Sequence, residues 1–182
     1  MDIFGRVWAV ILAVMVMFIT PVAIFAQKQD VTVQNYVDDA AHEFIDISRS
    51  TGYIAESSYD RLINRLDNTG NVYDIKLTHY KERQYPVFES GEVVDYDTGY
   101  DIETTDTVLG IIYGTYEDEE GNAIHGENAE HRYSMSSGDY IKIEIKNTNP
   151  TLGRRFMSLL FMRPAEGGQI FTSYGGYVGN EA

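Results

Sequence analysis

The side chains that could do chemistry in this chain are four histidines and 28 acidic residues, because the sequence contains no cysteine. His125 and His131 flank Glu127 and Glu130, a combination of imidazoles and carboxylates of the kind that binds zinc. Their spacing does not bring both imidazoles to one helix face, and the surrounding residues are typical of a loop. We therefore favour a solvated loop over a metal site.

Residues 117–122 (EDEEGN) form a second acidic cluster, which would suit a hard cation such as calcium. The cluster lacks the alternating ligand positions and the distal bidentate Glu of helix-loop-helix calcium sites, so we interpret it as a charged turn. The sequence contains no nucleophile elbow, phosphate-binding glycine loop, zinc-protease motif or dinucleotide fingerprint. No pair of carboxylates stands out as a glycosidase pair would. We expect no enzymatic activity, no metal and no cofactor.

Tyrosine is the remaining candidate, with 14 residues in the chain. Its rigid amphipathic ring suits contact surfaces, but it equally suits half-buried positions in strands. A tyrosine-rich binding face and ordinary strand packing therefore both stay open. The residues concerned are Tyr80, Tyr85, Tyr96, Tyr100, Tyr113, Tyr116, Tyr174 and Tyr177.

The charge of the chain limits the classes of molecule that it can bind. Its net charge is −14, and all of it lies beyond residue 26, because Asp2 and Arg6 cancel. Nucleic-acid binding needs clustered Lys and Arg, so this composition predicts no nucleic-acid partner. The aromatic content of 13% argues against disorder, and the residues after 26 are enough for one domain with its own core.

Residues 7–26 (VWAVILAVMVMFITPVAIFA) carry no charge, and as a helix they would span about 30 Å of hydrocarbon. We predict a transmembrane anchor over residues 1–26. A cleaved signal peptide is the alternative, although the apolar run is long for one and Ile24 is a poor residue before a cut at Ala26. The positive-inside rule, applied to Arg6 and the terminal amine, places residues 27–182 outside the cytoplasm. The predicted lipid-facing residues are Val7, Trp8, Val10, Ile11, Leu12, Val14, Val16, Phe18, Pro21, Ile24 and Phe25.

Residues 31–48 continue with apolar side chains at helical spacing, which predicts an amphipathic stem helix joined to the anchor. The stem should end at Thr51-Gly52. Its predicted packing residues are Val33, Tyr36, Val37, Ala40 and Phe44.

The remaining residues predict an α+β domain. We expect a helix over residues 59–67 capped by Ser57 or Ser58, and strands over 72–80, 108–116, 140–146 and 169–178, the last interrupted by Gly175-Gly176. Residues 81–107 show no clear period, so we expect a long excursion with short strands near 92–96. A short helix follows Thr151 and closes before Pro164. Its arginines could touch lipid or a partner, but an amphipathic core helix is the preferred interpretation.

Four segments carry a resemblance in order: DIFGRVWAVILAVMV, VQNYVDDAAHEFIDISRSTGYI, SSYDRLINRLDNTGNVYDIKLTH, and a tail with GDYIKIEIKNTNPTLGRRFMSLLF and YGGYVGNE. In this combination the chain resembles small TadE/TadF-like pseudopilins, encoded beside tight-adherence (Flp) type pilus machinery, particularly in Gram-positive bacteria. The resemblance implies a non-catalytic minor pilin or assembly component in the cytoplasmic membrane. Its implied partners are the lipid bilayer and other pilin-like subunits or assembly platform proteins. A membrane-anchored binding or sensor domain is the alternative.

Overall fold

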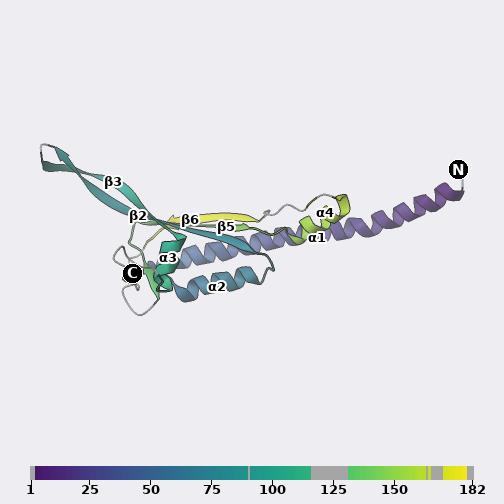
Figure 1. The fold of residues 1–182 in the computed structure, drawn as a ribbon, viewed down its shortest axis with the longest axis horizontal. Helices are drawn as coiled ribbons and strands as arrows, with labels where there is room; N and C mark the ends of the chain where they lie inside the picture. Colours follow the sequence, from purple (N-terminus) through teal and green to yellow (C-terminus); the bar gives the residue numbers. More distant parts are fainter. Residues whose placement is uncertain (1–2, 90, 116–130, 163, 165–169, 180–182) are drawn as a thin grey trace.

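The computed structural model describes residues 3–89, 91–115, 131–162, 164 and 170–179. A long N-terminal helix, α1 (Ile3–Thr51), runs through the head domain, which we define as residues 27–182, and projects beyond it (Figure 1). The predicted α+β class is confirmed. The predicted turn over 117–122, with Tyr116, His125, Glu127 and Glu130, lies outside the described residues.

The anchor and the stem form one uninterrupted helix of 49 residues, with Pro21 inside it. Its buried residues begin only at Ala26, because the preceding residues lie beyond the head domain. The helix ends where predicted: Gly52 follows with a φ of 79°, a left-handed conformation that glycine adopts without strain.

The main sheet has four antiparallel strands in the order β3-β2-β5-β6. They are β2 (Tyr73–Glu89), β3 (Glu92–Thr104), β5 (Tyr140–Asn147) and β6 (Phe171–Tyr177). Ile141, Ile143 and Ile145 of β5 are fully buried, whereas the residues between them are partly exposed, as their alternation predicts. A two-stranded sheet pairs β1 (Tyr53–Ala55) with β4 (Arg132–Ser134).

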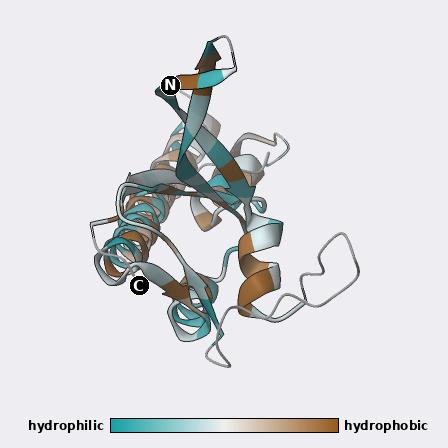
Figure 2. Cartoon of the chain, turned by 90° about the vertical axis from the view of Figure 1, so that its left-hand side faces the viewer, coloured by the Kyte–Doolittle hydropathy of each residue, from teal (hydrophilic) through white to brown (hydrophobic). Residues whose placement is uncertain are grey.

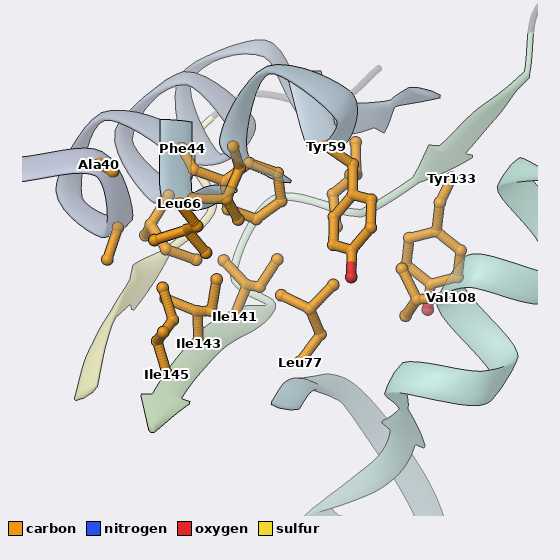
Figure 3. Packing of buried hydrophobic residues seen from close by; sticks show 14 of the residues in the cluster. Ala40, Phe44, Tyr59, Leu66, Leu77, Val108, Tyr133, Ile141, Ile143 and Ile145 are labelled. Carbon is orange, nitrogen blue, oxygen red and sulfur yellow. The ribbon is translucent and has the colours of Figure 1, made fainter. Parts of the chain in front are cut away.

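The hydrophobic core lies between this sheet and the second half of α1. Phe44 and Ala40 of α1 face the isoleucines of β5, and α2 (Glu56–Asp67) closes the side of the layer (Figure 3). Leu66 of α2 and Leu77 of β2 complete the contact. Because burial of one such side chain contributes about 1.5–3 kcal/mol, the head domain relies on this layer for its stability, without disulfides.

The strand expected near residues 92–96 lies within β3, but the expectation of a long excursion over residues 81–107 with only short strands is wrong. β2 and β3 pair from Thr78–Thr104 to Glu89–Glu92, with one shift of register between Val87 and Phe88, and the outer part of this hairpin projects away from the helices (Figure 1). Figure 2 shows that much of the hairpin is hydrophilic. Both faces of its outer part are solvated, so the burial alternation that marks a strand in a sequence is absent there.

The predicted strand over residues 108–116 is also wrong, because α3 (Thr105–Ile112) is a helix. In Figure 2 it is the short, largely hydrophobic helix on the right-hand side. Val108 and Ile112 are one turn apart and fully buried on the same face. The Thr105 hydroxyl accepts a hydrogen bond from the Leu77 N–H at 2.8 Å, which fixes the start of α3 against β2. A short apolar run does not distinguish a strand from a buried helix by itself.

Two smaller corrections concern α2 and β6. α2 begins at Glu56, with Ala55 rather than a serine at the N-cap and no side-chain cap. Gly175 and Gly176 lie inside an uninterrupted β6. A Cβ on Gly175 would lie 2.6 Å from the Tyr140 hydroxyl, so this glycine makes room for a neighbouring ring.

Candidate functional site

The most unusual feature of the molecule is the first half of α1, residues 3–26, which we call the apolar half. By length and composition it is apolar enough for α1 to cross a membrane once, and almost all of it is exposed. A helix that is apolar all round is stable in water only when protein covers it. Every predicted lipid-facing residue is exposed: Val7, Trp8, Val10, Ile11, Leu12, Val14, Val16, Phe18, Pro21, Ile24 and Phe25.

The second half of α1 has the opposite character. Of the predicted packing residues, Val37, Ala40 and Phe44 are buried and Val33 packs against the core as a partly buried residue. Tyr36 is 37% exposed, at the edge of this face, where the Arg65 guanidinium lies 5.1 Å from its ring centre. The same helix therefore joins a core element of the head domain to an uncovered apolar rod.

The two halves meet beside α4 (Leu152–Phe161). Thr151 Oγ1 donates to Asp30 Oδ2 at 2.7 Å, and the Gly153 N–H donates to Asp30 Oδ1 at 3.2 Å. A Cβ on Gly153 would lie 3.1 Å from the Ala26 carbonyl and overlap the Asp30 carboxylate. Asp30 thus holds the start of α4, where the helix dipole favours a negative charge, and Gly153 permits this close approach.

We expect Asp30→Ala to lower the free energy of unfolding by about 1–2 kcal/mol, because it leaves a Thr hydroxyl and a helix N-terminal N–H without their acceptor. Chemical denaturation of the detergent-solubilised chain, followed by tyrosine circular dichroism, measures this change. Asp39→Ala on the same helix is the control. An equal effect of both changes would show that Asp30 does not fasten α4.

A buried polar cluster lies at the base of the β2–β3 hairpin. His79 and Asp139 are 0% and 4% exposed, and His79 Nε2 lies 3.0 Å from Asp139 Oδ2. The other ring nitrogen, Nδ1, lies 2.7 Å from the Tyr133 hydroxyl. Asp139 also accepts the N–H groups of Glu82 and Ser136, at 3.0 and 2.8 Å. The cluster therefore ties β2, β4 and the turn before β5 together.

Burial lowers the pKa of His79, although the nearby Asp139 carboxylate opposes this shift. Burial likewise raises the pKa of the Tyr133 hydroxyl. A neutral imidazole then donates from Nε2 to Asp139 and accepts from Tyr133 at Nδ1. Every ring nitrogen has a partner, and the cluster is closed to solvent, so its arrangement suits a structural role rather than general acid–base chemistry.

Because the pKa of His79 is lower in the folded than in the unfolded chain, its contribution to stability is full above the unfolded value of about 6.5 and is lost as the pH falls through the folded value. The slope from this residue is at most about 1.4 kcal/mol per pH unit. Unfolding free energies at pH 7 and pH 5, compared between the native chain and His79→Gln, measure it. A steeper fall for the variant would contradict the direction of the shift.

Of the histidine–carboxylate pattern seen in the sequence, only His131 is described; among the described residues, no three His, Asp or Glu side chains come together around a possible metal position. His131 instead pairs with Glu56 at 3.2 Å, and His42 stacks against Tyr174. Sequence reasoning missed the His79–Asp139 pair, because 60 residues separate its members.

The described tyrosines do not form one face. Tyr80, Tyr140 and Tyr177 form a row across neighbouring strands, with ring centres 5.9 and 5.0 Å apart. Three others lie on the projecting hairpin, and two contact helices: Tyr113 donates to Asp60 of α2 at 2.7 Å, and Tyr174 meets α1. The hairpin tyrosines are Tyr85, Tyr96 and Tyr100, which are about half exposed or more.

Comparison with known proteins found no similar protein. No protein-family model matches the chain, and neither the curated proteins nor the solved structures contain a significant match.

Proposed function

We propose that this chain is a single-pass membrane protein whose α1 passes from the bilayer into an extracytoplasmic head domain, and that it acts as a pseudopilin-like structural or assembly component of a tight-adherence type pilus or related envelope appendage. One observation carries the proposal. A single 49-residue helix is a core element of the head at one end and an uncovered apolar rod at the other. This matches the pilin-like plan, in which the apolar half of a long helix sits in the bilayer and can pack on like helices.

The contacts of α4 support retention of the apolar half over its removal as a signal peptide. Ala26 is 8% exposed and Gly153 packs on its carbonyl. A cut after Ala26 would remove that residue and make Asp30 the fourth residue of the new chain. The head and the anchor therefore share packing contacts, whereas a removable leader would be expected to leave the mature fold untouched.

The absence of cysteine allows a direct test with single-cysteine variants of the full chain. Val10→Cys lies in the apolar half, and Val94→Cys lies on the hairpin; both positions are exposed, at 63% and 56%. In native membranes we expect oxidation to cross-link position 10 to a second copy or to a membrane partner. In intact cells an impermeant maleimide should label position 94 and not position 10.

Three results would count against the proposal. The first is a mature chain that begins at Gln27, and the second is a position 94 protected in intact cells and labelled only after lysis. The third, a chain that is anchored but never cross-linked and absent from sheared surface appendages, would leave anchoring and remove the appendage role.

The second candidate, an anchored binding module, is favoured by the β2–β3 hairpin. Phe88, Val93 and Tyr96 near its tip are 63%, 46% and 61% exposed. Exposed aromatic residues on a rigid projecting element are typical of contact surfaces. Replacing Phe88 and Tyr96 by Ser should leave the unfolding transition unchanged. If this variant stays folded and membrane-anchored but no longer binds its partner, this candidate is favoured.

A further inference from the structure

α4 presents apolar side chains to solvent although it belongs to the head domain. Leu152, Leu159 and Met162, at its two ends, are 56%, 79% and 95% exposed, and Leu160 is 36% exposed. Isolated exposed leucines need no explanation, but several on one short helix indicate a surface that contacts something apolar.

The position of α4 along α1 indicates what that surface meets. Among residues 3–25, Ile19 and Ala23 alone are partly shielded, and with Ala26 they form one stripe of α1. The contacts of Gly153 with Ala26 and Asp30 place the start of α4 at the end of this stripe, and Figure 1 shows α4 lying along α1 on the side toward the N-terminus. α4 is therefore level with the last turns of the predicted membrane span.

The depth at which α4 would lie in the bilayer agrees with that of an interfacial helix. Seven residues separate Ile19 from Ala26, which corresponds to about 10 Å along the axis of α1. Helices bound at the boundary of headgroups and acyl chains bury their apolar face about 5–10 Å deep. If residues 7–26 fill the hydrocarbon, the exposed leucines of α4 enter the outer part of the same leaflet.

The charge of this segment also differs from that of the rest of the molecule. Residues 151–165 contain three arginines and no acidic residue, in a chain with a net charge of −14. Arg155 of α4 is exposed, and Lys28 is exposed on α1 at the same level. Cations placed here complement anionic phosphates, whereas the remaining head surface would be repelled by them.

We propose that α4 is a second membrane contact, a short interfacial helix that inserts its exposed leucines into the leaflet on the head's side and pairs Arg155 with anionic lipid phosphates. This rests on the proposed spanning role of α1. Such a contact fixes the tilt and rotation of the head relative to the bilayer, which one helix alone leaves free.

The test uses the full chain, reconstituted in vesicles of phosphatidylcholine with and without phosphatidylglycerol, and an environment-sensitive fluorophore on single cysteines. Leu159→Cys reports on α4, Val14→Cys on the span and Val94→Cys on the hairpin as an exposed apolar control. Lipids with nitroxide-labelled acyl chains should quench the fluorophore at positions 14 and 159 and not at 94. Phosphatidylglycerol should increase quenching at position 159 only.

A charge reversal separates the lipid contact from general effects on the fold. Arg155→Glu should abolish the increase that phosphatidylglycerol produces at position 159, and Arg61→Glu, an exposed arginine of α2, should not. Quenching at position 14 without quenching at 159 would overturn the contact and leave the anchor. No quenching at either position would overturn the anchor itself. Protection of position 159 from aqueous iodide without quenching by lipid would mean that another protein chain covers α4, which also overturns the proposal.

Discussion

Val14→Arg is expected to abolish stable membrane integration of this chain. Val14 lies within the uncharged run of residues 7–26, and its side chain is 48% exposed on the outside of α1. An arginine near the bilayer centre costs about 2.5–3.5 kcal/mol on insertion scales, or roughly two orders of magnitude in the insertion equilibrium. Extraction of cell membranes at alkaline pH separates integral from peripheral protein and measures the loss.

Val94→Arg is the matched control, because it places the same charge at an exposed valine of the hairpin. It should leave the chain in the membrane fraction. Unchanged fractionation of Val14→Arg, with a native mass for the mature chain, would refute the membrane span and with it the proposed contact of α4.

Asp139→Ala should be the most destabilising single change in the polar part of the head domain, at about 3 kcal/mol. It removes the acceptor of His79 Nε2 and of the N–H groups of Glu82 and Ser136, and each buried donor without a partner costs about 1–3 kcal/mol. Because these donors belong to β2 and to the turn before β5, we expect the hairpin base to loosen first. Chemical denaturation of the detergent-solubilised chain, followed by near-ultraviolet circular dichroism of the tyrosines, measures the change.

Asp97→Ala on the exposed hairpin is the control and should stay within about 0.5 kcal/mol of the native chain. The loss of unfolding free energy for Asp139→Asn should lie between those of Asp139→Ala and Asp97→Ala. Asparagine keeps one acceptor oxygen, but its NH₂ group is a donor that faces the buried N–H donors. If Asp139→Ala and Asp97→Ala unfold at the same denaturant concentration, the buried cluster does not stabilise the head domain.

Local sequence patterns were enough to predict a helix or strand where that element buries one face against the core. The alternation of residues 140–146 predicted β5, and the three-and-four spacing over residues 31–48 predicted the stem, because each pattern reflects contact with a single apolar layer. Such a pattern did not predict the hairpin, because both faces of its outer part are exposed to water. α3 was missed for the opposite reason: Leu109 and Ile111, between its buried residues Val108 and Ile112, also pack against the core, which hides the helical period.

By itself, the sequence determined that this chain has an uncharged segment long enough for a membrane helix, an acidic α+β domain after it and a stem that joins them, since composition and periodicity are local properties. Only the tertiary structure decided what distant residues do together. It placed Asp139 against His79, and Asp30 against Thr151 and Gly153. It also brought the leucines of α4 level with the end of the apolar half. These contacts join residues far apart in the chain, and long-range packing, which no local pattern encodes, decides which of them meet.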